Sequence, residues 1–184
     1  TFLENAPIVP VSVYKEEGLE QLKQVLTELC VSLPERSEAG YFRLPIDRVF
    51  TLKGFGTIVT GTLMEGKLKK DQNIVLYPEN EPVKVRSLQV HSKDAEAAWA
   101  GQRVAVNVPD RKKEEIFRGD VLATADSLYP TMMVDVKLEV LKHTERTIKH
   151  GSRVHIYHGT KELLGKVSLM NCDELKAGDS GYAQ

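Results

Sequence analysis

The sequence has few cysteines and no long apolar run. Its two cysteines, Cys30 and Cys172, lie far apart and lack Cys-x-x-Cys spacing. This excludes a disulfide framework and a cysteine-based zinc site, and we expect two free thiols in a reducing cytoplasm. No apolar stretch approaches the ~20 residues of a membrane-spanning helix. Residues 1–5 have neither the basic segment nor the apolar core of a signal peptide, and without an initial Met we expect an excised piece of a longer chain.

An excess of positive charge is also lacking. Lys and Arg total 25, Asp and Glu total 26, and the net charge is −1. A global field that attracts nucleic acid is therefore excluded, and any such contact must come from a local patch. The two charged runs, residues 67–71 and 111–115, are expected to be solvated turns.

Motifs of phosphate binding, nucleophilic catalysis and metal binding are absent. Gly54-x-Gly56 has no third glycine and no Gly-Lys-Ser/Thr, and a strand follows it, so these glycines are expected to form a turn. No serine has a Gly-x-Ser-x-Gly setting. His150, His155 and His158 are close in sequence but do not fit zinc-ligand spacing. We expect no catalytic residue and no metal site in this chain.

The first 40 residues predict a strand, a helix and a linker. Residues 6–13 are typical of a short buried strand whose two prolines limit its pairing. From about residue 18 to 33, apolar residues recur at three- and four-residue steps, which predicts an amphipathic helix that Pro34 ends. One strand and one helix cannot form a core, so we expect this segment to pack on a larger domain. The polar residues 35–40 predict an interdomain linker.

The rest of the chain predicts β-structure throughout. Between residues 41 and 126, turn signals separate six predicted strands: 43–52, 57–62, 73–77, 83–90, 103–108 and 121–124. This spacing is typical of a closed antiparallel barrel. A second β segment begins at residue 129. Apolar and polar residues alternate over 132–141, which predicts a half-buried strand, and the pattern continues at 154–156 and 163–169.

A resemblance to a known family rests mainly on residues 46–61, Ile46-Asp47-x-x-Phe50-x-x-x-Gly54-x-Gly56-Thr57-x-Val59-Thr60-Gly61. This pattern resembles the second domain of translational GTPases of the EF-Tu family. Ala100-Gly101-Gln102-Arg103 and Arg118-Gly119-Asp120 are similar to later landmarks of that domain. Through Ile46-Asp47-Arg48 and Lys53-Gly54, the chain is most similar to the selenocysteine-specific subgroup, SelB.

The resemblance implies a mainly β fold of two consecutive antiparallel barrels, preceded by a strand–helix remnant of an α/β G domain. The implied domains are 1–38 (end of the G domain and linker), 41–127 (second domain) and 129–184 (truncated third domain). A missing strand would leave an open edge, so we expect weak self-association.

The resemblance also implies a function. The intact factor would use GTP and Mg²⁺ to carry selenocysteinyl-tRNA to the ribosome in the cytoplasm, and a C-terminal region absent here would recognise an mRNA hairpin. Ser12 and Val13 stand where the family contacts guanine. This chain has no P-loop and no Asn-Lys-x-Asp motif, so we expect it to have no GTPase activity of its own.

In this family the second domain forms part of the pocket for the esterified amino acid, and the subgroup carries residues like Asp47, Arg48 and Arg103 there. A selenol is more acidic than a thiol, so selenocysteine is an anion at neutral pH. Two guanidinium groups, oriented by Asp47, would favour the selenolate over a neutral side chain. Adjacent strand residues point to opposite faces, so Asp47 and Arg48 share a pocket only if a β-bulge redirects one of them.

Three alternatives remain. The charges at 47, 48 and 103 fit equally an exposed ion pair worth ~0–1 kcal/mol. The chain fits another EF-Tu-family GTPase, such as a general elongation factor, although a carrier of many amino acids gains nothing from two cations in its pocket. It also fits a non-catalytic β-barrel module that docks protein partners through an exposed apolar patch.

Overall fold

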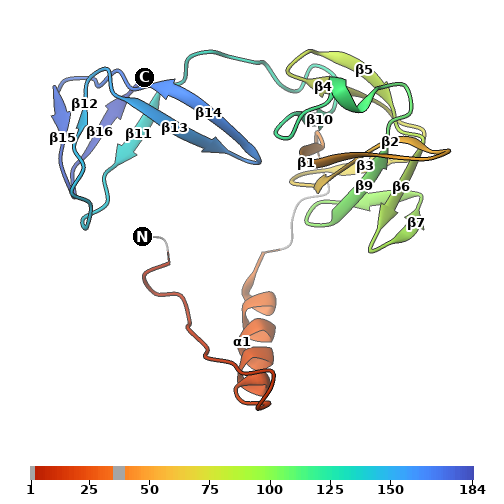
Figure 1. Ribbon diagram of the computed structural model, residues 1–184, viewed down its shortest axis with the longest axis horizontal. Coiled ribbons are helices and arrows are strands. Elements are labelled where there is room, and N and C mark those ends of the chain that lie inside the picture. Colours follow the sequence, from red (N-terminus) through yellow and green to blue (C-terminus); the bar gives the residue numbers. More distant parts are fainter. Residues whose placement is uncertain (1–2, 35–39) are drawn as a thin grey trace. The chain divides into compact units, whose positions relative to one another are not determined.

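The computed structural model describes residues 3–34 and 40–184, and within them the chain is mainly β with one α-helix (Figure 1). The mainly β fold class predicted from the sequence is confirmed. The chain divides into two units, Thr1–Glu35 and Arg36–Gln184. Most of the predicted linker, residues 35–39, lies outside the described residues.

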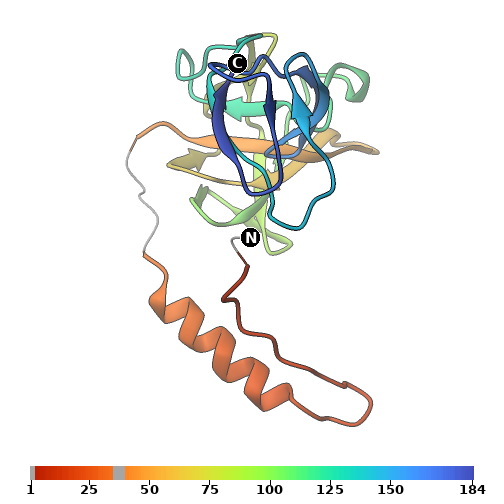
Figure 2. The ribbon, with the colours of Figure 1, turned by 90° about the vertical axis from the view of Figure 1, so that its left-hand side faces the viewer.

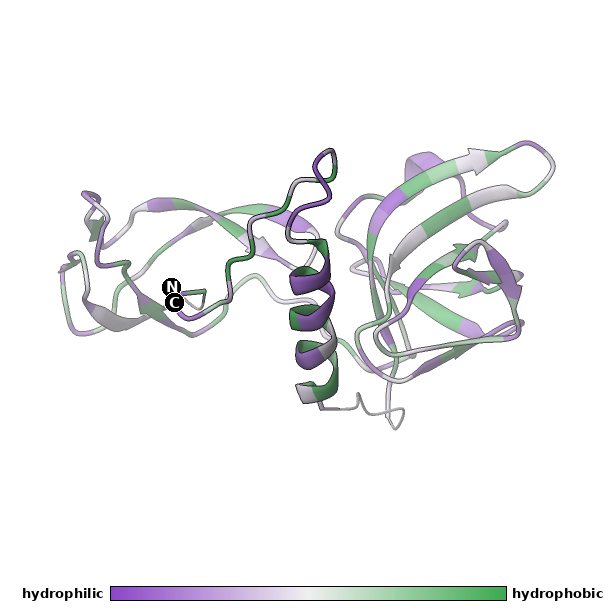
Figure 3. Ribbon diagram, turned by 90° about the horizontal axis from the view of Figure 1, so that it is seen from below, coloured by the Kyte–Doolittle hydropathy of each residue, from purple (hydrophilic) through white to green (hydrophobic). Residues whose placement is uncertain are grey.

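The first unit contains the predicted helix, α1 (Leu19–Ser32), which confirms the amphipathic pattern. The helix begins after Gly18, whose φ of +74° favours glycine, and a Cβ at Gly18 would lie 2.2 Å from the carbonyl oxygen of Pro10. Residues 3–18 turn back alongside the helix (Figure 2). Apolar and polar residues divide between faces of α1 (Figure 3), yet none of its residues is buried. This unit has no core of its own.

The predicted buried strand over residues 6–13 is wrong. Its one pairing is an isolated bridge between Ser12 and Glu17, and Ile8 and Val13 are exposed to 93% and 78%. A β-strand needs a neighbouring strand to satisfy its N–H and C=O groups. The described part of the chain offers residues 6–11 no such neighbour, so the apolar pattern alone does not produce a strand.

The second unit begins with an eight-stranded antiparallel sheet in the order β5-β4-β10-β1-β2-β9-β6-β7. Its strands are β1 (Arg43–Leu52), β2 (Gly56–Thr62), β4 (Asn73–Tyr77), β5 (Glu81–Lys84), β6 (Ser87–Val90), β7 (Lys93–Ala95), β9 (Arg103–Asn107) and β10 (Val121–Ala123). A separate pair joins β3 (Lys67–Lys69) to β8 (Ala97–Trp99). The predicted strands are present, but the one predicted over 83–90 is divided into β5 and β6, and β3, β7 and β8 were not predicted.

The main hydrophobic core takes residues from every strand of this sheet except β7. Strand β2 alternates strictly, with Thr57, Val59 and Gly61 buried, while Val83 of β5 and Leu88 of β6 enter the same cluster from opposite ends of the strand order. The sheet therefore wraps around its core. Its order ends at β5 and β7, so the closed barrel stays a prediction.

The β1–β2 hairpin confirms the predicted glycine turn. Gly54 and Gly56 both have φ of +86°, a region that other residues rarely adopt, and the N–H of Phe55 donates to the carbonyl of Leu52 at 3.0 Å. The local chemistry of residues 53–56 thus places β1 beside β2.

The last part of the second unit contains three antiparallel strand pairs. They are β11 (Val136–Glu139) with β16 (Ser180–Ala183), β12 (Ile148–Lys149) with β15 (Glu174–Leu175), and β13 (Arg153–His158) with β14 (Lys161–Lys166). They share a small core of Val167, Leu169, Leu175 and Ala183. The predicted strand over 132–141 forms only at 136–139. Met132 is fully exposed (100%), because β11 finds just four partners in β16.

Gly61 offers a test of the close approach between β1 and β2. A Cβ at this position would lie 2.2 Å from the carbonyl oxygen of Pro45 and 2.7 Å from Cδ2 of Leu44. We expect Gly61→Ala to lower the free energy of unfolding by about 1–3 kcal/mol, measured by denaturant titration. The control Thr51→Ala changes an exposed residue of the same hairpin and should stay within about 0.5 kcal/mol. Equal midpoints for the two variants would contradict this packing.

Candidate functional site

A β-bulge lies at the position of the predicted site. Ile46 faces Gly61 and Arg48 faces Thr60, so two consecutive residues of β2 oppose three of β1, and Asp47 is the extra residue. Ile46 stays fully buried in the core. Arg48 is exposed and lies opposite Thr60, on the outer face of the sheet. The bulge thus removes the geometric objection that adjacent strand residues point to opposite faces.

Asp47 and Arg103, two of the predicted site residues, are brought together. Oδ2 of Asp47 lies 2.9 Å from Nη1 of Arg103, and its Oδ1 accepts from Nη2 at 3.0 Å. Thr60 Oγ1 donates to the same Oδ1 at 2.7 Å. A two-point guanidinium–carboxylate contact fixes the plane of the arginine head group. The Arg103 side chain remains 54% exposed and that of Asp47 20%. The ion pair therefore orients the Arg103 guanidinium but adds little to the stability of the fold.

Arg48 is placed differently. Its side chain has no hydrogen bond or ion pair with any residue in the described ranges 3–34 and 40–184. It lines an open depression of about 560 Å³ together with Lys113 and Arg118, and Phe50 and Phe117 add aromatic surface. Arg103 is not among the lining residues. The Arg103 guanidinium is therefore held by Asp47, whereas the Arg48 guanidinium faces an open, positively charged surface.

Sequence reasoning missed part of this surface. Lys113 belongs to a run expected to be a solvated turn, which forms the short 3₁₀ helix η1 (Lys113–Glu115). Glu114 lines the same depression, so the local charge is mixed but positive in sum once Asp47 is paired with Arg103. The sequence feature that could have indicated Lys113 is the short separation along the chain between this run and Arg118-Gly119-Asp120, a landmark of the resemblance.

The predicted guanine contacts lie in the first unit. The N–H of Ser12 donates to the carbonyl of Glu17 at 3.0 Å, and the N–H of Glu17 donates back at 3.1 Å. The backbone of Ser12 is thus already occupied. Val13 is exposed, and its N–H has no partner among the described residues. The Val13 N–H and the Ser12 hydroxyl, which accepts from the N–H of Lys15 at 3.3 Å and can still donate, are therefore the groups left for a contact to a guanine base.

Two of the three clustered histidines, His150 and His155, make local side-chain contacts. His155 Nδ1 lies 2.7 Å from Oε1 of Glu162, and the hydroxyl of Tyr157 donates to the same oxygen at 3.1 Å. This hydrogen bond raises the pKa of the Tyr157 phenol above its ordinary value. His150 Nδ1 lies 3.3 Å from the carbonyl of Leu169. Across the described ranges, no three His, Cys, Asp or Glu side chains are grouped as a metal ion would require.

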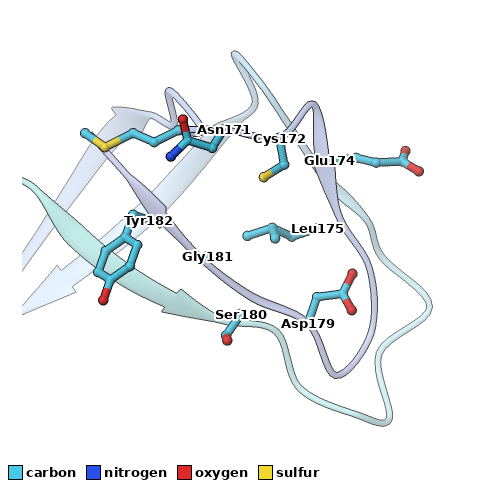
Figure 4. A pocket seen from close by; sticks show the side chains of 9 residues that line it. Asn171, Cys172, Glu174, Leu175, Asp179, Ser180, Gly181 and Tyr182 are labelled. Carbon is cyan, nitrogen blue, oxygen red and sulfur yellow. The ribbon is translucent and has the colours of Figure 1, made fainter.

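A second depression, of about 450 Å³, lies around β15 and β16 (Figure 4). It brings together the thiol of Cys172 and the carboxylates of Glu174 and Asp179. Asp179 Oδ2 accepts from the N–H of Lys176 at 2.8 Å, and Glu174 pairs with the Lys176 ammonium at 3.1 Å. Both carboxylates serve the local turn, and this depression adds nothing to the site on β1.

Comparison with known proteins bears on this geometry. Residues 56–123 match the family described as elongation factor Tu domain 2. The chain is 42% identical over its whole length to a selenocysteine-specific elongation factor of Desulfomicrobium baculatum, and 32% identical over 98% of its length to one of Methanocaldococcus jannaschii. The crystal structure of a bacterial selenocysteine-specific elongation factor, EF-Sec, superposes on the whole chain with a TM-score of 0.79 and 27% identity.

The chain is similar to the selenocysteine-specific elongation factors. The resemblance predicted from the sequence is confirmed, both for the EF-Tu domain 2 segment and for the subgroup. The chain spans 29% of the Desulfomicrobium baculatum relative, 41% of the Methanocaldococcus jannaschii relative and 30% of the EF-Sec chain. Within the part of the chain that the structure describes, no helix combines the length and apolar character needed to cross a bilayer.

The ion pair at the bulge can be tested by its response to salt. We expect Asp47→Asn to cost at most about 1 kcal/mol of unfolding free energy at low salt, and less near 1 M salt, because the pair is partly exposed and screened. Asp94→Asn is the matched control, since the Asp94 carboxylate accepts from the neutral amide of Gln89. If Asp47→Asn lowers the free energy of unfolding equally at both salt concentrations, the charge of Asp47 does not contribute to stability.

Proposed function

We propose that this chain supplies the aminoacyl-binding surface of a selenocysteine-specific elongation factor, whose intact form delivers selenocysteinyl-tRNA to the ribosome in a GTP-dependent manner. The observation that carries this proposal is the β-bulge at Asp47. It places Asp47 and Arg48 on the face that also carries Thr60 and Arg103. The similarity to two relatives named selenocysteine-specific elongation factor supports this assignment.

The selectivity that we propose comes from charge. A selenolate is an anion at neutral pH, whereas a serine hydroxyl is neutral and a thiol of pKa ~8.5 is mostly neutral. Arg48 offers an unpaired guanidinium, and Arg103 offers one whose orientation Asp47 fixes. Hydrogen bonds from the two guanidinium groups would therefore be stronger to the selenolate, where both partners are charged, than to the neutral serine hydroxyl.

The tRNA itself would meet the depression beside the bulge. Lys113 and Arg118 can neutralise phosphates next to the esterified end, and Phe117, exposed to 60%, offers a surface on which a base can stack. Such contacts position the tRNA without distinguishing one amino acid from another. Selectivity and general affinity would thus rest on different residues of one surface.

The domain assignment is part of the proposal. Residues 1–38 would complete a G domain, with Ser12 and Val13 touching guanine, while 41–127 and 129–184 form the second and third domains. Bound GTP with Mg²⁺ supplies the switch between tRNA-bound and released states, and its phosphates must be held outside this chain, which has no phosphate loop. The factor would act in the cytoplasm, and an mRNA hairpin would be recognised by another region of the factor.

The decisive experiment uses the intact factor with GTP. Its affinity would be measured for selenocysteinyl-tRNA and seryl-tRNA carried on the same tRNA. We expect a preference for selenocysteine that falls roughly tenfold to hundredfold in Arg48→Ala and in Arg103→Ala, the effect of losing a charge-assisted hydrogen bond. Arg86→Ala, at an exposed arginine elsewhere on the sheet, is the control and should leave the preference unchanged. Equal binding of both esters by the wild type would identify a general elongation factor instead.

The pH dependence of cysteinyl-tRNA binding separates charge from shape. As pH rises through the thiol pKa, ~8.5, the cysteine side chain becomes an anion, so its affinity should rise in the wild type. Seryl-tRNA should show no such rise, and Arg103→Ala should flatten the cysteine curve. Rapid mixing keeps the measurement ahead of ester hydrolysis. A cysteine curve as flat as the serine curve would argue for recognition by shape.

We also propose weak self-association through the last segment. Met132, Met133 and Val134 precede β11 and are exposed to 100%, 63% and 55%, and Leu164 of β14 to 75%. Exposed apolar side chains of this kind favour association. Light scattering should show dimers that increase with protein concentration, and fewer in Leu164→Lys. A strict monomer at high concentration would contradict this.

A further inference from the structure

The turn between β13 and β14 contacts the bulge directly. Gly159 and Thr160 connect the two strands, because His158 pairs with Lys161. Thr160 Oγ1 donates a hydrogen bond of 2.7 Å to the carbonyl of Ile46, the residue immediately before the bulged Asp47. In Figure 1 the β13–β14 hairpin extends from the last segment of the chain. A hydroxyl from that segment thus bonds the backbone that presents the candidate site.

The same carbonyl has a second donor. The N–H of Gly119 donates to the Ile46 oxygen at 2.9 Å, and the N–H of Ile46 donates to the carbonyl of Asp120 at 2.8 Å. A carbonyl oxygen has two lone pairs, so Thr160 and Gly119 use both acceptor positions. The orientation of the peptide between Ile46 and Asp47 is therefore set from the side opposite β2. Of these three bonds, the one from Thr160 is the only one made by a side chain.

Further contacts show that the turn is seated closely. A Cβ at Gly119, where φ is +95°, would lie 2.4 Å from the Cβ of Lys161. The Lys161 ammonium lies 3.1 Å from Oδ1 of Asp120, a carboxylate only 1% exposed. Removing this partner would leave a buried charge uncompensated, which is strongly unfavourable. Arg118 Nε also donates to the carbonyl of Thr160 at 3.2 Å, and Arg118 lines the depression beside Arg48.

We propose that Thr160 is a positioning residue of the aminoacyl site. Its hydroxyl holds the Ile46 carbonyl so that the bulge keeps Asp47 on Arg103 and directs Arg48 to the depression. Among the described residues, Thr160 makes no hydrogen bond with Asp47, Arg48 or Arg103, so it acts through the backbone of β1. The identity of the ligand, an aminoacyl group on tRNA, rests on the proposed function. Through this hydrogen bond to Ile46, the segment 129–184 influences which amino acid is selected on the central sheet.

Thr160→Val removes the hydroxyl and nearly keeps the volume, whereas Thr160→Ser keeps the hydroxyl. In the intact factor with GTP, we expect the preference for selenocysteinyl-tRNA over seryl-tRNA to fall about threefold to tenfold in Thr160→Val, the effect of losing one hydrogen bond. Thr160→Ser should restore it to within about twofold. Thr144→Val is the matched control, since the Thr144 hydroxyl accepts from Arg146 within its own loop and should have no effect.

A second readout does not depend on the ligand. Amide hydrogen exchange of residues 44–50, measured in the intact factor without tRNA, should be several-fold faster in Thr160→Val than in Thr160→Ser. Unchanged exchange would overturn the inference, whatever the amino acid preference. Faster exchange with an unchanged preference would make Thr160 merely structural and would also overturn it. If the wild type shows no preference, the proposed function fails, while exchange still decides whether the turn holds the bulge.

Discussion

The candidate site depends on one extra residue in a strand. In a regular β-strand, Asp47 and Arg48 would point to opposite faces, and one of them would enter the core. Because Asp47 is inserted against Gly61 and Thr60, both charges stay outside while Ile46 and Val49 still pack against the core. The buried residues on either side prevent the register from slipping, since a slip by one residue would expose them. The same apolar packing that stabilises the sheet thus holds the charges in place.

The two arginines have different electrostatic surroundings, and this difference suits a site for an anion. The positive charge of Arg103 is balanced by the Asp47 carboxylate, and the Thr60 hydroxyl donates a hydrogen bond to Oδ1 of the same carboxylate. Arg48 stays unpaired at low cost because it is exposed to water. A bound anion that displaces this water would strengthen the attraction to Arg48, since charges interact more strongly at lower dielectric. An open surface can therefore tolerate an unpaired cation until a ligand covers it.

Local patterns predicted the helix, the β1–β2 hairpin and the long strands of the central sheet. They missed β3, β7 and β8, which have three residues each, and β12, β15 and β16, which have two to four, too few for an alternating pattern to be recognised. They also predicted strands at residues 6–13 and 132–135, where alternation or apolar content is right but no partner strand is present among the described residues. Pairing partners are distant in sequence, so a local pattern cannot guarantee them.

The sequence by itself determined the chemistry of the site: which side chains carry charge, where glycine permits a tight turn, and which strand residues are apolar. These properties depend on residue type and on near neighbours. Only the tertiary structure decided that Asp47 bulges, that it meets Arg103 across 56 residues of chain, and that Thr160 bonds Ile46 across 114. Such contacts follow from register and from packing between distant segments, because their geometry exists only once the sheet has packed around its core.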